Sequence, residues 1–178
     1  ERRLLDHVNP YTGMAYKNDP ALAVVEVHNE DSVFWHGPLN DLAAGTKYPL
    51  HTADLKLKWQ QWVLATYTNN ANLTAAWGSG MRSGDSVTNT NMPIYGAWEL
   101  DATGPENRPN EKKRAGDFIK FLADTQGAYY AQREQQLRTL GYQAVTVTTA
   151  WKVGGAASDL ANLYNDDTMN AIDRHDYF

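Results

Sequence analysis

The sequence contains no cysteine among its 178 residues, which excludes a disulfide framework and any metal site with cysteine ligands. It also has no excess of positive charge, since 16 lysines and arginines face 21 aspartates and glutamates for a net charge of -5. Nucleic acids and anionic membrane surfaces attract clustered positive charge, so we expect neither as a partner. No apolar run approaches the roughly 18 residues that a membrane-spanning helix needs.

The composition is that of an ordinary soluble globular protein, with 42% hydrophobic and 21% charged residues. Residues 1–7 have the pattern of the last turns of a helix, and residues 172–178 have that of a strand with no turn after it. We therefore interpret the sequence as a piece of a longer chain, truncated at both ends. The lack of cysteine leaves the cellular compartment open.

The stretch from residue 21 to residue 32 combines an apolar run with a cluster of ionisable groups. Its alternation is typical of a β-strand, in which successive side chains point to opposite faces. The apolar face carries Ala23, Val25 and Val27, and the polar face carries Glu26, His28 and Glu30. Because buried polar groups are costly without a purpose, we expect this face to line a substrate-binding mouth at the end of a barrel strand.

The rest of the chain alternates between helical and strand patterns. Apolar spacing predicts helices over 52–67, 69–77 and 111–140, with loops over 31–49, 81–110 and 151–167. Further strands are predicted over 144–150 and 171–178. Strands separated by helices pair in parallel, and reactive groups then gather at their carboxyl ends. We predict an α/β fold in one domain over 1–178, a partial (β/α)8 TIM barrel with three parallel strands and a helical insertion over about 31–110.

Two short motifs add a family resemblance. Glu26-Val27-His28-Asn29-Glu30 resembles the Glu-x-x-Asn-Glu that ends the fourth barrel strand of retaining glycoside hydrolases of clan A, especially the cellulase-like family 5. His175-Asp176-Tyr177 is similar to the His-x-Tyr that ends the sixth strand of the same enzymes. The resemblance implies strands four to six of a TIM barrel. Asp31 departs from it, because the family has a proline there.

The resemblance also implies a role for each motif residue. Glu30 would be the general acid/base, Asn29 would contact the sugar 2-hydroxyl, and both His175 and Tyr177 would support the catalytic carboxylates and the sugar. It implies a β-linked poly- or oligosaccharide as the substrate, no cofactor, and a nucleophilic glutamate beyond Phe178 in the remainder of the barrel. We therefore expect the chain by itself not to hydrolyse glycosides. Analogy with the family suggests a secreted or periplasmic protein.

Tryptophans fall into two groups by their position in the pattern. Trp151, directly after a predicted strand, and Trp35, in a predicted loop, are candidates to stack on sugar rings. Trp59, Trp62 and Trp77 recur at helical spacing, so we expect them in the core.

Two other functions fit the same residues. His28, Glu30, Asp173 and His175 offer imidazole and carboxylate ligands for a divalent metal, as in a metal-dependent barrel hydrolase or isomerase. No HExxH or comparable spacing supports a metal site, and we predict none. The other alternative is a carbohydrate-binding barrel that has lost catalysis. A glutamate at the end of the next strand would favour the enzyme over the binding domain.

Overall fold

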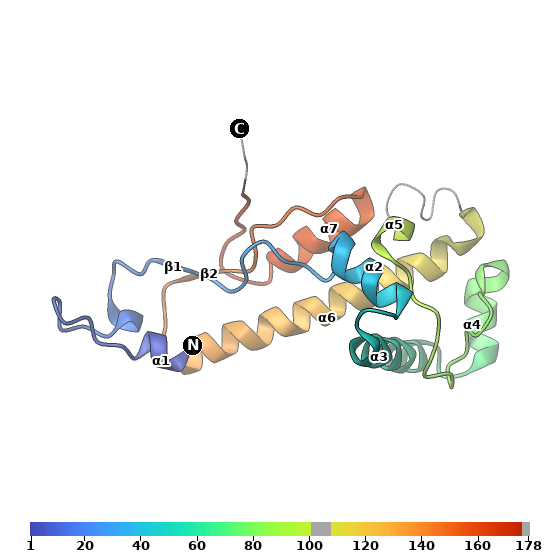
Figure 1. Ribbon diagram of the computed structural model, residues 1–178, viewed down its shortest axis with the longest axis horizontal. Coiled ribbons are helices and arrows are strands. Elements are labelled where there is room, and N and C mark those ends of the chain that lie inside the picture. The colour runs from blue at the N-terminus through green and yellow to red at the C-terminus, as the bar shows by residue number, and fades with distance from the viewer. Residues whose placement is uncertain (101–107, 176–178) are drawn as a thin grey trace. The chain divides into compact units, whose positions relative to one another are not determined.

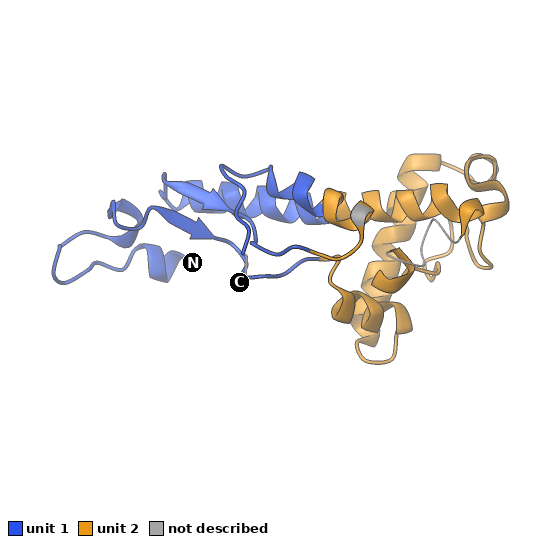
Figure 2. Cartoon of the chain, turned by 90° about the horizontal axis from the view of Figure 1, so that it is seen from above, with its two compact units in different colours: residues 1–32, 125–152, 162–178 blue, residues 33–124, 153–161 orange. Residues whose placement is uncertain are grey.

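The computed structural model describes residues 1–100 and 108–175 (Figure 1). These residues form two compact units, coloured separately in Figure 2. Unit 1 comprises residues 1–32, 125–152 and 162–178, and unit 2 comprises residues 33–124 and 153–161. Two helices, α6 (Lys112–Thr139) and α7 (Ala156–Asp166), contribute residues to both units.

Unit 1 contains a small parallel sheet. Its strands, β1 (Val24–Glu26) and β2 (Val145–Val147), pair from Val24 opposite Val145 to Glu26 opposite Val147, and they lie side by side in Figure 1. The short helix α1 (Arg2–Leu5) and the 3-10 turn η1 (Tyr16–Asn18) precede β1.

The core of unit 1 lies under the apolar face of β1. Val25 and Val27, which the alternating pattern assigns to that face, are partly buried against a cluster of buried side chains. The cluster joins α1 to the carboxyl end of α6, with the members Leu5, Leu137, Leu140 and Tyr142. Burial of these apolar groups keeps the opposite face of β1 free for polar side chains.

Unit 2 is helical in the residues that the structure describes. Its complete elements are α2 (His36–Ala44), α3 (Pro49–Tyr67), α4 (Asn70–Trp77), η2 (Gly78–Gly80), α5 (Ala97–Leu100) and η3 (Pro109–Glu111). The first turns of α6 and of α7 complete the unit. Across the described part of the chain, none of the helices has the length and apolar character that crossing a bilayer requires.

An aromatic cluster forms the core of unit 2. The fully buried ring of Trp59 stacks on Trp62 and Trp77, with centroids 5.5 and 5.9 Å away, and also contacts Phe118 and Phe121. The expectation that Trp59 and Trp77 belong to the core is confirmed, while Trp62 is half-buried.

The predicted partial TIM barrel is wrong. Within the described ranges the chain is mainly helical, and its sheet consists of the two three-residue strands β1 and β2 rather than three barrel strands. The alternating pattern correctly located both strands but overestimated their length. A strand continues only while a neighbouring strand pairs with its backbone N–H and C=O groups. The extent of that pairing depends on the tertiary fold and not on the local sequence.

The predicted third strand over 171–178 is also wrong in its described part, because residues 171–175 form no strand. The backbone N–H of Asn170 donates to Thr146 O (3.2 Å), and that of His175 donates to Ala150 O (3.1 Å). Between these two hydrogen bonds the segment advances by five residues, from 170 to 175, whereas its neighbour advances by four, from 146 to 150. This mismatch prevents a regular ladder, although the segment follows the residues of β2 and those after it in the same direction.

Besides the loop over 81–110, which contains the single turn α5, two predicted loops contain longer helices. The first, over 31–49, contains α2, which was predicted as a loop because the segment is rich in Gly and Pro. The helix ends at Gly45, which has φ 74°. The second, over 151–167, contains α7. Helix α3 also begins earlier than predicted, because Pro49 occupies its first turn, where the missing N–H costs nothing.

Candidate active site

The site begins where β1 ends. Beyond the ladder, the N–H groups of Val27 and His28 still donate to Val147 O and Thr148 O, both at 3.0 Å. The chain then turns, and Glu30 adopts a positive φ of 45°, which is rare for a residue with a Cβ. The N–H of Asp31 donates to Thr149 Oγ1 (2.9 Å) and anchors the turn. Backbone strain of this kind, typically ~1–3 kcal/mol, is concentrated at functional positions.

Glu30 and His175 are brought together from positions 145 residues apart. His175 Nδ1 lies 2.7 Å from Glu30 Oε1, and the Glu30 side chain is 23% exposed. An ionised carboxylate only accepts hydrogen bonds, so Nδ1 carries the proton in that state of the pair. One residue of each motif therefore meets in space, and the roles of these residues remain predictions.

Two further carboxylates surround the imidazole of His175. Glu26 Oε1 accepts the N–H of Ala150 (3.1 Å), and Asp173 Oδ2 lies 4.0 Å from His175 Nε2. The hydrogen bond to Glu30 raises the pKa of His175 most, and the negative charges of Glu26, Glu30 and Asp173 add to this effect. The imidazolium form is thus favoured by its surroundings.

The same groups could hold a divalent metal. One ligand atom each from Glu26, Asp173 and His175 lies within 4.8 Å of the others. This set shares two members with the four ligands of the metal-dependent alternative, but it has Glu26 in place of His28 and Glu30. His28 Nδ1 lies 3.7 Å from Asp31 Oδ2 instead.

The other predicted site residues are less closely associated with Glu30. Asn29 is exposed and precedes Glu30 directly. Trp151 is half-buried in unit 1, where its backbone oxygen accepts a hydrogen bond from Asn162 (3.2 Å). Trp35 belongs to unit 2. Tyr177 lies outside the described residues.

Sequence reasoning missed the buried polar residues of α7. Asn162 and Asp166 are fully buried and lie one helical turn apart, in a range that was predicted to be a loop. Their side chains contact the segments that carry Glu30 and His175. The sequence does place the two polar residues at i, i+4 spacing beside apolar residues. This spacing indicates a shared face only once the segment is known to be a helix.

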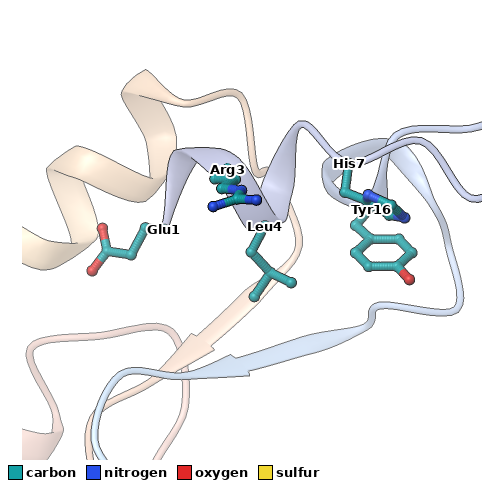
Figure 3. Close-up of a pocket in the computed structure, with 5 residues that line it drawn as sticks. All are labelled: Glu1, Arg3, Leu4, His7 and Tyr16. Atoms are coloured by element: carbon teal, nitrogen blue, oxygen red, sulfur yellow. The ribbon is translucent and has the colours of Figure 1, made fainter.

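A hollow of about 500 Å³ lies elsewhere in unit 1. Figure 3 shows the side chains that line it. The residues that line it come from α1, the residue before it and the turns that follow, namely Glu1, Arg3, Leu4, His7 and Tyr16. None of the predicted site residues that the structure describes is among them. The five lining residues include one carboxylate, that of Glu1, whereas several carboxylates surround His175. We therefore place the candidate active site at Glu30 and His175.

Comparison of the chain with protein-family models, with curated proteins and with solved structures finds no match. A function is therefore inferred from Glu30 and its surroundings.

The contact between Glu30 and His175 leads to a prediction about pH. Replacement Glu30→Gln removes the negative charge that stabilises the imidazolium, so the pKa of His175 should fall toward its ordinary value. An NMR titration of the His175 ring protons, in buffer with a chelator, measures this. Asp173→Asn should lower the same pKa less, because Asp173 lies farther from the ring. An unchanged pKa in Glu30→Gln would contradict the contact.

Proposed function

We propose that this chain supplies the general acid/base of a retaining glycoside hydrolase that acts on a β-linked poly- or oligosaccharide. The observation that carries the proposal is the carboxylate of Glu30, which is partly buried and held 2.7 Å from the Nδ1 of His175. Supporting observations are the strained backbone at Glu30 and the neighbouring amide of Asn29. The resemblance of both motifs to those of glycoside hydrolases points to the same reaction.

The reaction needs two carboxyl groups. In a retaining glycosidase they lie ~5–5.5 Å apart, and one attacks the anomeric carbon while the other protonates the departing oxygen. Glu30 would act in its protonated form, donating that proton as the C–O bond breaks, and the resulting carboxylate would later remove a proton from the water that hydrolyses the glycosyl intermediate. The proposal assigns only the acid/base, Glu30, to this chain.

An external nucleophile tests the role of Glu30 within this chain. Azide can attack the anomeric carbon of a phenyl β-glycoside while the proton of Glu30 passes to the phenolate oxygen, giving an α-glycosyl azide and phenol. We expect no cleavage without azide and measurable cleavage with it, across a panel of β-glucosides, β-xylosides, β-mannosides and β-galactosides.

Each other outcome of the azide assay has a defined meaning. Absence of azide-dependent cleavage across the whole panel would overturn the proposal. If calorimetry then detected binding of β-linked oligosaccharides, the non-catalytic carbohydrate-binding alternative would be favoured. Cleavage without azide, abolished by Glu30→Gln, would support the acid/base role but show that the nucleophile lies within this chain.

A second candidate function is metal-dependent hydrolysis. It is favoured by the proximity of Glu26, Asp173 and His175, which offer the oxygen and nitrogen ligands that Zn²⁺ and Mn²⁺ accept. A metal bound there would activate a water molecule as the nucleophile.

Chelation separates the two candidates. We expect EDTA to leave azide-dependent cleavage unchanged, because proton donation by Glu30 and attack by azide need no metal. Rates measured before and after dialysis against EDTA, and after addition of Mn²⁺ or Zn²⁺, provide the test. Loss of activity with EDTA, restored by either metal and absent in Asp173→Asn, would instead favour the metal-dependent function.

A further inference from the structure

Asp166, at the carboxyl end of α7, connects two segments of the site. Its fully buried carboxylate accepts hydrogen bonds from Thr148 Oγ1 and from Arg174 Nη1, both at 2.6 Å. Thr148 follows β2, and Arg174 directly precedes His175. The bond to Arg174 joins two charged groups, so it is stronger than a bond between neutral groups.

Asn162, one turn earlier in α7, connects the third segment. Its Oδ1 accepts hydrogen bonds from Ser32 Oγ (2.7 Å) and from Gln126 Nε2 (2.9 Å). Its Nδ2 donates to Trp151 O and to Asp166 Oδ2, both at 3.2 Å. Ser32 lies two residues after Glu30, so the amide is linked to the turn that carries the proposed acid/base.

We infer that Asn162 and Asp166 are positioning residues that hold Glu30 and His175 in hydrogen-bonding distance. The inference rests on the proposed function for the catalytic meaning of that contact. These two side chains contact all three segments that form the site: the turn after β1, the residues after β2 and the segment before His175. We call the pair the α7 clamp.

The fold gives the clamp a specific task. The segment 170–175 forms no ladder with its neighbour, so sheet hydrogen bonding does not fix its side chains as it would in a strand. The ion pair between Arg174 and Asp166 compensates by attaching this segment to a buried point of a helix. The backbone of His175 is held by Ala150 O, so we expect loss of the ion pair to let the His175 side chain turn away from Glu30. A displacement of about 1 Å at a catalytic group can reduce a rate by ~100-fold.

The clamp is tested by the ring ¹⁵N chemical shifts of His175. At a pH above the pKa of His175, contact with ionised Glu30 keeps the proton on Nδ1. We expect Asp166→Asn to shift this signal toward the tautomer with the proton on Nε2. Azide-dependent cleavage should show a fall in kcat of up to ~100-fold with little change in KM, because the proton donor is misplaced rather than the sugar lost.

A matched control is available in unit 2. Asp117 is also a buried carboxylate with several donors, among them Trp77 Nε1 (2.7 Å) and Lys113 Nζ (2.5 Å). Asp117→Asn should destabilise the protein without moving the ¹⁵N signals of His175. If it moved them as well, the shift in Asp166→Asn would be due to a general loss of stability.

A second variant guards against misfolding of Asp166→Asn. Arg174→Gln removes the same ion pair from its more exposed end, and should shift the His175 signals in the same direction. Unchanged signals in a folded Asp166→Asn or Arg174→Gln protein would overturn the clamp. The ¹⁵N signals are measured without any hydrolysis. A shift of these signals would therefore support the clamp even if the proposed function were wrong.

Discussion

Glu30→Gln should reduce azide-dependent cleavage of phenyl β-glycosides by ~100-fold to ~10,000-fold, the usual contribution of a general acid. The glutamine side chain keeps the shape of the glutamate but has no proton to donate to the departing phenolate. A 2,4-dinitrophenolate leaves without protonation, so cleavage of the dinitrophenyl glycoside should change little. Rates for both substrates, measured at one pH and one azide concentration, give the leaving-group dependence directly.

Glu134→Gln is the matched control for this experiment. Glu134 is also a partly buried glutamate of unit 1, with a side chain 20% exposed and hydrogen bonds to Arg138 and Thr146. Glu134→Gln should cleave the phenyl and the dinitrophenyl glycosides with the same ratio of rates as the native chain. Equal losses of both substrates in Glu30→Gln would contradict the acid role and indicate instead that Glu30 supports the structure or binds the sugar.

Asp85→Asn should lower the free energy of unfolding of unit 2 by about 3–5 kcal/mol. The side chains of Asp85 and Arg114 are both 0% exposed, and their closest atoms lie 2.7 Å apart. The substitution would leave the Arg114 guanidinium buried without a counter-charge, although it would keep its bond to Pro93 O (2.7 Å). Unfolding in urea, followed by tryptophan fluorescence, measures the loss because five of the six tryptophans belong to unit 2.

Asp54→Asn provides the corresponding exposed control. Asp54 pairs with Lys58 one turn later in α3, and both side chains are more than half exposed. Solvent screens such a pair, so its loss should cost at most about 0.5 kcal/mol. If the two variants had equal midpoints in urea, the buried pair would not have the stabilising role that its burial indicates.

Local patterns correctly predicted several elements. Helix α6 (Lys112–Thr139) lies within one residue of its predicted bounds, because its apolar stripe is long and Gly141 marks its end. Both β1 and β2 occur within their predicted ranges, and Val25 and Val27 pack on the core side as the alternation indicates. These predictions succeeded because each depends on residues that are close in sequence.

The barrel was predicted from the order of the elements, and this step failed. The order of strand, helix and strand favours parallel pairing of β1 and β2, which the structure has. It does not determine how many further strands join the sheet. The segment before His175 has one residue too many to match its neighbour, and no local pattern reveals that mismatch.

The sequence by itself singled out the groups to which the proposal assigns chemistry: the carboxylate of Glu30, the amide of Asn29 and the imidazole of His175. Only the tertiary structure decided that Glu30 and His175 touch, and that Asn162 and Asp166 attach their segments to α7. The physical reason is distance along the chain. Side-chain type and spacing act over a few residues, whereas a contact across 145 residues depends on how the whole of unit 1 packs.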